Sequence, residues 1–337
     1  MFEPAVPRPD EVSLPTALQV EVTGACNLSC QMCLVSYRPR LGRSAHLSLS
    51  SLRSLLDDLP SLREVTLQGL GEPLLVRDLE AMVREVSSRG IRVGLNTNGT
   101  LLTAAKSRAL IAAGLDWLHV SVDGACQETF AAIRVGGHLD TVLNHLRQLL
   151  LVRAELGVGR PRVQMNTVVM RRNASELDAL VDLAADVGVD RLWIQGLSHD
   201  FADVDRDETF VAIRGWTAQQ QLRDEELDTL LAHAARRARE LGLDLRLPDA
   251  PDTRPPRAAG EPGCDWPWRS AYVGYDGTVQ PCCMVMGHER GVLGNIHEQR
   301  LSSIWRSAEY ESLREGLRSE HDPPEICRGC AVYRHRF

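Results

Sequence analysis

The sequence predicts an α/β fold, in which a parallel sheet forms a partial (β/α)6 TIM barrel and a small C-terminal module follows. Six strand-like segments alternate with helix-like segments between residues 17 and 200. Glycines end several of these helices, among them Gly90, Gly114 and Gly188, as is usual at helix C-termini. Right-handed connections between such units give a parallel sheet, and six units suit a partial barrel rather than a closed eight-stranded one.

The elements follow in regular order. Strands are predicted at about residues 17–23, 64–68, 91–95, 117–121, 162–169 and 191–195. A helix capped by Ser48 or Ser50 follows a basic loop at 36–45, and further helices are predicted at 76–88, 103–113, 141–156 and 174–187. Beyond the barrel, an amphipathic helix begins at Arg223 and a short strand covers 243–247, whereas residues 201–222 are poorly patterned.

The chain divides into four predicted parts. These are an N-terminal arm (1–16), the barrel (17–200), a helical bridge with a Pro-rich linker (201–263) and a C-terminal module (264–337). In the last part a hairpin over residues 271–280 turns at Asp276-Gly277, a common dipeptide of hairpin turns. A helix from Ser302 to Leu317 follows it.

Composition and charge narrow the class of protein. The net charge of -7 argues against a nucleic-acid-binding surface. The N-terminus carries no secretory signal pattern and no stretch is long and apolar enough for a membrane span, so we expect a cytoplasmic protein without a membrane partner. In that reducing compartment the nine cysteines are poor candidates for disulfides. Eight of them fall into two groups, which predicts two metal sites.

The first group is a loop with the spacing C-x3-C-x2-C, formed by Cys26, Cys30 and Cys33 directly after the first strand. Thiolates are the usual ligands of iron–sulfur clusters. Three thiolates leave one iron of a [4Fe–4S] cluster open to another ligand. The alternative is a structural zinc knuckle that takes a fourth ligand from elsewhere.

Polar residues recur where the predicted strands end. Because the active site of such barrels lies at the C-terminal ends of the strands, these residues are expected to share one face. They are the segments 69–73, 96–99 and 121–124, then Asn166 within the fifth strand and Gln195 at the end of the sixth.

The cysteine loop and the turn Gly69-Leu70-Gly71-Glu72-Pro73 together resemble a radical S-adenosylmethionine (SAM) enzyme over about residues 17–200. The turn resembles that family's glycine-glutamate-proline motif. The resemblance implies a partial barrel, a SAM-binding [4Fe–4S] cluster and reductive cleavage of SAM to a 5′-deoxyadenosyl radical. It also implies a reducing partner such as flavodoxin or ferredoxin.

The same resemblance implies the contacts of SAM. Gly71 and Glu72 would meet the methionine ammonium, and Met32 would flank adenine. Ser121 and Arg134 are candidates for the carboxylate and the ribose hydroxyls, and Asn166 for another polar group. The alternatives are a helix-capping carboxylate for Glu72, a turn hydroxyl for Ser121 and a surface charge for Arg134.

The C-terminal module resembles a SPASM/twitch extension, because Cys264 is followed by a G-x4-C pattern ending at Cys282 and by Cys327-x2-Cys330. The resemblance implies that these four cysteines hold one auxiliary [4Fe–4S] cluster. A full SPASM domain would continue with more cysteines, whereas this chain stops seven residues after Cys330. A zinc ribbon is the alternative.

Two cysteines lie outside this scheme. Cys283 could replace Cys282 as a ligand, be an inert neighbour, or be a catalytic thiol that gives a hydrogen atom to a substrate radical. Cys126 is expected only to pack.

The first functional interpretation is a radical SAM oxidoreductase or epimerase that takes a hydrogen atom from a small polyhydroxylated substrate, a sugar, aminoglycoside or aminocyclitol. The alternative is a maturase that crosslinks or epimerises a ribosomal peptide, which the short arm before the first strand disfavours. A third interpretation is a metal-binding regulator or scaffold. The sequence does not choose the catalytic base among His199, Asp200 and an arginine. Further candidate substrate contacts are Gln195, Trp266, Trp268, Arg38 and Arg40.

Overall fold

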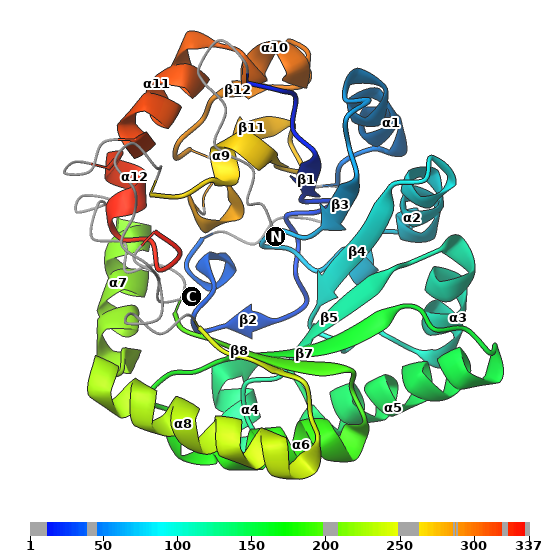
Figure 1. Ribbon diagram of the computed structural model, residues 1–337, viewed down its shortest axis with the longest axis vertical. Helices are drawn as coiled ribbons and strands as arrows, with labels where there is room; N and C mark the ends of the chain where they lie inside the picture. The colour runs from blue at the N-terminus through cyan, green and yellow to red at the C-terminus, as the bar shows by residue number, and fades with distance from the viewer. Residues whose placement is uncertain are drawn as a thin grey trace.

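A curled sheet forms the centre of the protein. The computed structural model describes residues 12–38, 46–197, 208–248, 263–285, 287, 289–318 and 323–333. Within them the main sheet has ten strands, in the order β12-β11-β10-β1-β3-β4-β5-β7-β8-β9, and β2 (Ser29–Cys30) pairs separately with β6 (Arg134–Val135). Figure 1 shows the strands around the middle and the helices outside them.

The six predicted barrel strands are present and parallel. They are β1 (Ala17–Val20), β3 (Glu64–Leu67), β4 (Arg92–Thr97), β5 (Trp117–Ser121), β7 (Arg162–Val168) and β8 (Arg191–Gln195). Each pairs in parallel with the next in that order. The short strand β9 (Leu245–Arg246) adds a parallel partner to β8. The partial barrel is therefore confirmed.

Helices cover the outer face of this sheet (Figure 1). They are α1 (Leu49–Asp58), α2 (Leu79–Ser88), α3 (Ala104–Ala113), α5 (Leu139–Glu155), α6 (Leu177–Val187) and α8 (Asp224–Leu241). The Ser48 side chain accepts a hydrogen bond from the Ser51 amide and so caps α1. Gly114 and Gly188 end α3 and α6 in the left-handed conformation that glycine adopts without strain.

Two longer helices of the described chain were not predicted, nor were the short helices α9 (Trp266–Arg269) and α12 (Glu325–Arg328), and one predicted helix is divided. The two longer helices are α4 (Gln127–Ile133) and α7 (Glu208–Gln220). On α7 the apolar pattern is weak. Residues 302–317 form α10 (Leu301–Trp305) and α11 (Ala308–Arg318), because Ser307 begins the second helix by accepting a hydrogen bond from the Tyr310 amide.

The C-terminal hairpin joins the barrel sheet instead of standing apart from it. Its strands are β10 (Ser270–Val273) and β11 (Thr278–Gln280), with Gly277 at φ 84° in the turn, and β12 (Gly294–Asn295) follows. Strand β10 pairs in parallel with β1, from Ala17 opposite Ser270 to Val20 opposite Val273. The hairpin is confirmed, but its place as a continuation of the sheet was not predicted. Two short helices, α9 (Trp266–Arg269) and α12 (Glu325–Arg328), flank it in the chain.

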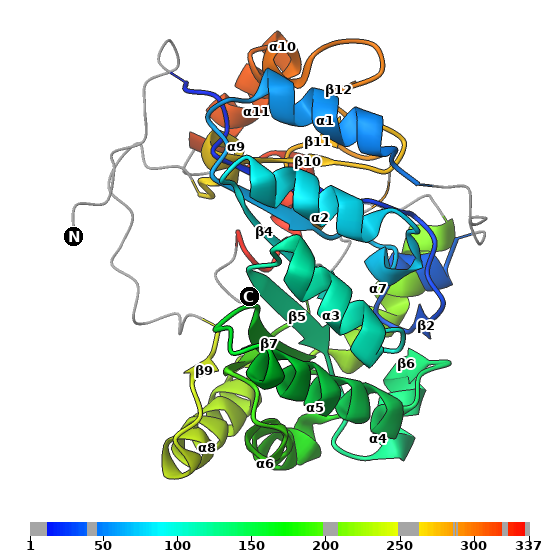
Figure 2. The same cartoon turned by 90° about the vertical axis from the view of Figure 1, so that its right-hand side faces the viewer.

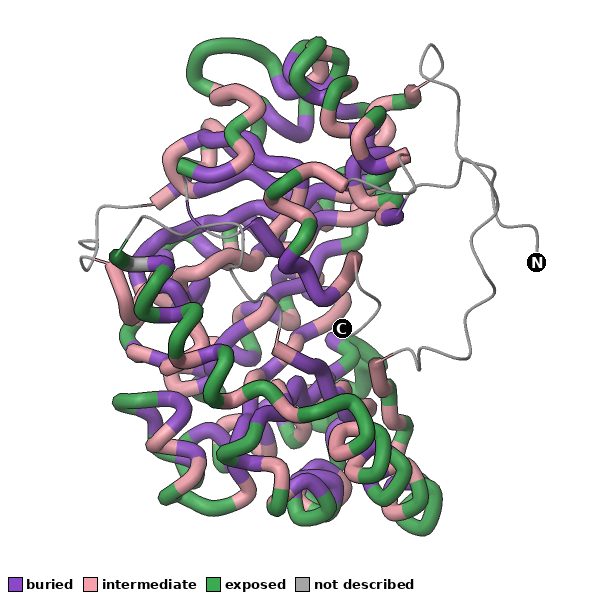
Figure 3. Tube along the Cα trace, turned by 90° about the vertical axis from the view of Figure 1, so that its left-hand side faces the viewer, coloured by how far each residue is buried: buried purple, intermediate pink, exposed green. Residues whose placement is uncertain are grey.

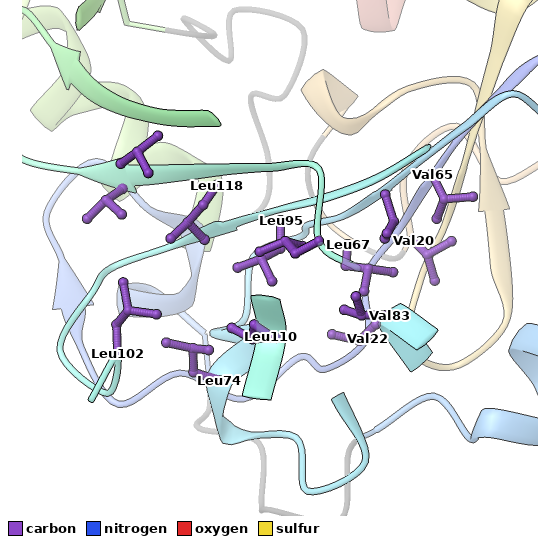
Figure 4. Close-up of a cluster of buried hydrophobic side chains, with 14 of the residues drawn as sticks. Val20, Val22, Val65, Leu67, Leu74, Val83, Leu95, Leu102, Leu110 and Leu118 are labelled. Atoms are coloured by element: carbon purple, nitrogen blue, oxygen red, sulfur yellow. The ribbon is translucent and has the colours of Figure 1, made fainter. Parts of the chain in front are cut away.

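The two faces of the barrel strands differ in polarity. Residues such as Val65, Leu67, Leu95 and Leu118 belong to one buried cluster (Figure 4). The residues between them on the same strands are mostly polar, so the inner face is polar. Figure 3 shows the buried strands enclosed by helices whose outer surfaces are exposed. In the part of the chain that the structure describes, no helix is long and apolar enough to cross a membrane.

Candidate active site

The three N-terminal cysteines lie on the loop that leaves β1. Two glycines after β3 allow the neighbouring turn to press against this loop. A Cβ atom on Gly71 would lie 2.0 Å from the Thr23 carbonyl oxygen and 2.7 Å from that of Ala25, and one on Gly69 would overlap the Glu21 side chain. Only glycine permits so close an approach. The motif resembling glycine-glutamate-proline therefore fixes the path of the cysteine loop.

The Glu72 carboxylate is buried and fully used inside the protein. One oxygen, Oε1, accepts hydrogen bonds from the Thr97 hydroxyl at 2.6 Å and the Leu74 amide at 3.0 Å, and Oε2 accepts one from the Asn98 amide at 2.8 Å. These are the contacts of a helix-capping carboxylate, and they also tie the turn to the end of β4. A contact between Glu72 and SAM stays a prediction.

Arg134 is buried, not a surface charge. Its Nε donates to Asp123 Oδ2 at 2.6 Å, and its Nη1 donates to the Cys30 sulfur at 3.8 Å. The Asp123 carboxylate is fully buried and its second oxygen accepts from the Val168 amide at 2.7 Å. The ribbon of β2 and β6 places Arg134 directly opposite Cys30. The alternative of a surface charge is therefore wrong, because the guanidinium sits between a buried carboxylate and a thiol.

The other predicted SAM contacts lie at the same end of the barrel. Ser121 at the end of β5 pairs with Asn166 on β7. Asn166 is buried and accepts a hydrogen bond from Gln164 at 2.7 Å. Met32 and Asn166 both line the barrel cavity. The structure thus brings these residues near the cysteine loop, and their contacts with SAM stay a prediction.

The thiols of the loop are suited to metal rather than to proton chemistry. Burial raises the pKa of Cys26 to about 11 and that of Cys33 to about 12, and each also feels the charge of Cys30. Thiols with such pKa values stay protonated until a metal displaces the proton. The Leu28 amide and the Asn98 side chain approach the Cys26 sulfur, at 3.5 and 3.9 Å. Such N–H groups are the usual donors to cluster ligands.

The C-terminal cysteines also gather. The Cys282 thiol has a pKa raised well above its ordinary value by burial and then by the neighbouring thiols, which are Cys283, Cys330, Cys264 and Cys327. Burial raises the pKa of Cys264 to about 11 and that of Cys283 to about 12. Five sulfurs therefore lie within electrostatic reach of one another.

Buried donors without an acceptor occur in the same module, on α9 and α11. Four have no hydrogen-bond partner among the described residues: Trp266 Nε1, Trp268 Nε1, Tyr310 Oη and Arg314 Nη2. Unpartnered buried donors are costly. Trp266 interacts with Cys264 and Tyr310 with Cys282. The sulfides and thiolates of an iron–sulfur cluster are acceptors, so these two donors fit such a group. No three His, Cys, Asp or Glu side chains of the described chain lie close enough to hold a single ion, whereas the ligands of a cluster each bind a different iron.

A cavity of about 610 Å³ inside the barrel joins the two cysteine groups. It reaches from Met32, next to Cys33, to Cys264 and Cys283. Six side-chain amides line it, which are Gln19, Gln68, Asn96, Asn166, Gln195 and Gln280. Its charged lining residues are partly or fully exposed, and they are Glu64, Arg246, Asp265 and Arg269.

Cys283, and not Cys282, faces this cavity. The Gln19 side chain lies beside its thiol and opposes the rise of its pKa. This position suits a thiol that meets a substrate, although ligation of the cluster by Cys282 or by Cys283 stays open. Cys126 is exposed instead of packed, and its thiol contacts Glu176 at 3.5 Å.

The remaining candidate substrate contacts lie in different places, and not all of them line the cavity. Gln195 and Trp266 line the cavity, whereas Trp268 is buried outside its lining. Arg38 donates to the Gly24 carbonyl of the cysteine loop at 3.3 Å. Three candidates, His199, Asp200 and Arg40, lie outside the described residues, as do residues 1–11 of the predicted arm.

Sequence reasoning missed several residues of this site. Gln19 and Glu21 alternate with Leu18, Val20 and Val22 along the first strand. That polar alternation in an apolar run was the available signal for an inward-facing surface. The partnership of Asp123 with Arg134 had no sequence signal, because it depends on how α4 (Gln127–Ile133) folds the chain between the two residues.

Two family models match the parts of the chain that carry these sites. A model described as the radical SAM superfamily matches residues 20–184, and one described as an iron–sulfur cluster-binding domain, SPASM, matches residues 264–331. Together they cover more than half of the chain. The chain belongs to the radical SAM superfamily. As a radical SAM enzyme with a SPASM domain, it uses SAM with a [4Fe–4S] cluster and carries auxiliary iron–sulfur binding.

Relatives of this radical SAM enzyme act on different substrates. A protein of Pyrococcus furiosus, named tungsten-containing aldehyde ferredoxin oxidoreductase cofactor-modifying protein, is 27% identical over 88% of this chain and 82% of its own. A PqqA peptide cyclase of Ruegeria pomeroyi is 26% identical over 95% of this chain and 80% of its own. The crystal structure of Streptococcus suis SuiB bound to precursor peptide SuiA superposes with a TM-score of 0.72 at 16% identity, covering 95% of this chain and 70% of SuiB. That likeness shows a shared fold.

Proposed function

We propose that this radical SAM enzyme modifies a peptide, by forming a crosslink or by epimerising a residue. The cavity between the two cysteine groups carries this proposal. It combines neutral amides with large apolar and aromatic surfaces, including Leu70, Trp117, Trp193 and Trp266. A peptide offers backbone amides to the former and apolar side chains to the latter, whereas a polyol would leave the apolar surface poorly covered.

Two amides of this cavity support the proposal further. Gln19, a residue that is 4% exposed, has the Cys283 thiol beside its side-chain amide, and its Nε2 makes no hydrogen bond of good geometry within the described residues. Asn96 Oδ1 is an acceptor without a hydrogen bond within the same residues. A peptide backbone supplies both complements, a carbonyl and an N–H. The peptide enzymes among the relatives favour the same substrate class. The expectation of a small polyhydroxylated substrate therefore has less support than its alternative.

This proposal assigns a separate role to each group of residues. Cys26, Cys30 and Cys33 would hold the SAM cluster, and Cys264, Cys282, Cys327 and Cys330 the auxiliary one. Met32, Gly71, Ser121 and Asn166 would position SAM, which supplies the 5′-deoxyadenosyl radical that takes a hydrogen atom. In a crosslink the second electron leaves through the auxiliary site and the second proton goes to solvent. In an epimerisation the Cys283 thiol would return a hydrogen atom, and the thiyl radical left behind would regain an electron from the external reductant and a proton from solvent.

The first experiment is anaerobic turnover with SAM and dithionite. Candidate substrates are short peptides encoded next to the gene, and a set of sugars and aminocyclitols serves as the comparison. We expect 5′-deoxyadenosine formation to rise with a peptide, and the peptide to lose two hydrogen atoms or to take up solvent deuterium. Turnover coupled to a polyol and indifferent to every peptide would refute the proposal.

A matched variant tests the amide lining. Gln19→Met keeps the size of the side chain and removes the amide, which makes no hydrogen bond of good geometry and has only a thiol beside it. We expect a higher KM for the peptide with little change in kcat, and an unliganded protein that is at least as stable as the wild type. Lower stability of the unliganded variant would mean that the amide has a structural role.

A further inference from the structure

Arg134 connects the barrel wall to the middle cysteine of the loop. Its Nη1 lies 3.8 Å from the Cys30 sulfur and its Nε lies 2.6 Å from Asp123 Oδ2. The Arg134 side chain is 10% exposed and that of Asp123 is 0% exposed. The cation is therefore held beside the sulfur in an environment that screens charge weakly.

The position of this cation is fixed from several sides. Asp123 Oδ1, the carboxylate oxygen that Arg134 does not use, accepts a hydrogen bond from the Val168 amide. The Asp123 backbone carbonyl accepts one from Asn173 Nδ2 at 2.9 Å. The Gln31 amide donates to the Ile133 carbonyl at 2.9 Å, which joins the loop to the segment that carries Arg134. All of these contacts come from groups of the chain itself, so the protein positions the guanidinium.

A fixed cation beside a ligand sulfur has a direct electrostatic effect on a cluster. Reduction adds one negative charge to the cluster and its thiolates, and a nearby positive charge stabilises that state. Hydrogen bonds to the ligand sulfurs act in the same direction. The carboxylate of Asp123 acts in the opposite direction, from a greater distance.

We propose that Arg134, positioned by Asp123, raises the reduction potential of the cluster bound by Cys26, Cys30 and Cys33. The proposal rests on the assignment of Cys30 as a ligand. It goes beyond a contact with SAM, because it applies before SAM binds. The step concerned is a one-electron reduction by an external reductant, in which no bond of the chain forms or breaks.

The test is a redox titration of the reconstituted full-length protein without SAM, followed by electron paramagnetic resonance. SAM added to a reduced sample at the end identifies the signal of the open-iron cluster, because only that signal changes. For Arg134→Gln we expect the reduction equilibrium to fall at least tenfold, which for a one-electron couple is about 59 mV toward more negative potential. For Asp123→Asn we expect a shift toward less negative potential.

The opposite signs separate electrostatics from structural damage. A merely structural role would move both variants in the same direction or leave the potential unchanged, and either result would overturn the proposal. Arg134→Lys should restore most of the potential. The double variant removes both charges at nearly constant size, and because Arg134 is the nearer charge its potential should lie between those of Arg134→Gln and wild type. It covers the case in which a single variant does not fold.

Two controls keep this test independent of the ligand assignment. Arg108→Gln removes an exposed arginine that pairs with Glu155, and it should leave the potential unchanged. Cys30→Ala should remove the SAM cluster. If Cys30→Ala retains all its iron, the ligand assignment fails. If it loses the cluster but Arg134→Gln keeps the wild-type potential, only the role of Arg134 fails.

Discussion

Gly71 shows how one residue sets the geometry of the cysteine loop. The space where a Gly71 side chain would lie is occupied by the backbone carbonyl oxygens of Thr23 and Ala25. These cannot turn away as a flexible side chain could. The Glu72 amide also donates to the Ala25 carbonyl at 2.8 Å, so turn and loop are held in register. Any side chain at this position must displace the loop that carries Cys26.

We predict that Gly71→Ala loses the N-terminal cluster, because its Cβ would lie 2.0 Å from the Thr23 oxygen. Iron per chain should fall by about four atoms, the content of one [4Fe–4S] cluster. Iron analysis after anaerobic reconstitution measures this. Gly215→Ala is the matched control, because nothing lies within 4 Å of its Cβ. Equal iron in both variants would contradict the prediction.

His119 on the inner face of β5 gives a prediction on pH. Burial, and then the charges of Arg246 and Arg191, lower its pKa from 6.5 to about 4. The unfolded chain therefore binds a proton more readily than the folded one. The resulting stability is present above pH 6.5 and is lost as the pH falls toward 4, by at most about 3 kcal/mol.

Substitution of this histidine should remove that dependence. Between pH 7 and pH 5 the free energy of unfolding should fall less in His119→Gln than in wild type. The difference should be about 1 kcal/mol for each pH unit below 6.5. Urea unfolding at several pH values measures the difference. His233→Gln, at an exposed site on α8, is the control. Parallel curves for His119→Gln and wild type would show that the buried imidazole is not the source.

At the scale of elements, two helix ends give a matched pair. Gly188 and Gly114 both have positive φ, but nothing lies within 4 Å of a Cβ on Gly188, whereas one on Gly114 would lie 2.3 Å from Ser87 Oγ. We predict a cost of about 1 kcal/mol for Gly188→Ala from backbone strain alone. Gly114→Ala should cost about 1 kcal/mol more.

A double variant checks the origin of this difference. Ser87→Ala removes the clashing hydroxyl, so in that background Gly114→Ala should approach the cost of Gly188→Ala. Urea midpoints of the four proteins give the coupling energy. A coupling of zero would mean that the Ser87 hydroxyl simply rotates away.

The barrel elements were predictable because each carries its own signal. Leu177, Leu180, Val181 and Ala184 repeat at helical spacing and are buried on α6. In contrast, α7 buries mainly Phe210 and Ile213, so its pattern was too weak to detect. Pairing of β1 with β10 was beyond prediction, since the partners are about 250 residues apart in the sequence and no local pattern encodes such a contact.

The site was predictable to the same extent. The cysteine loop and the Gly71-Glu72 turn are each short contiguous stretches, so they could be found as sequence motifs. The role of Arg134 could not, because it depends on Asp123, which reaches it only in the folded barrel. The placement of Gln19 and Asn96 on the lining of one cavity could not be predicted either, because it depends on the folded barrel.

At the scale of the whole molecule, two separate cluster sites predict how iron is divided. With Cys26, Cys30 and Cys33 replaced by Ala, about four of about eight irons should remain, because the C-terminal thiols are a separate group. The reciprocal variant, with the C-terminal ligands replaced, should also keep about four. Iron analysis and absorption spectra measure both. If the variant without Cys26, Cys30 and Cys33 bound no iron at all, the assignment of two independent cluster sites would be wrong.

The pairing of β1 with β10 also has a consequence for synthesis of the protein. Figure 2 shows β10 and β11 beside the first elements of the chain, although they are made long after β1. While the ribosome extends the barrel, β1 presents an unpaired edge on its β10 side, and such edges promote aggregation. The edge closes only after residue 273 has emerged. The strand that leads into the first cysteine loop is therefore fully paired only when the C-terminal hairpin, which precedes the second cysteine group, has been made.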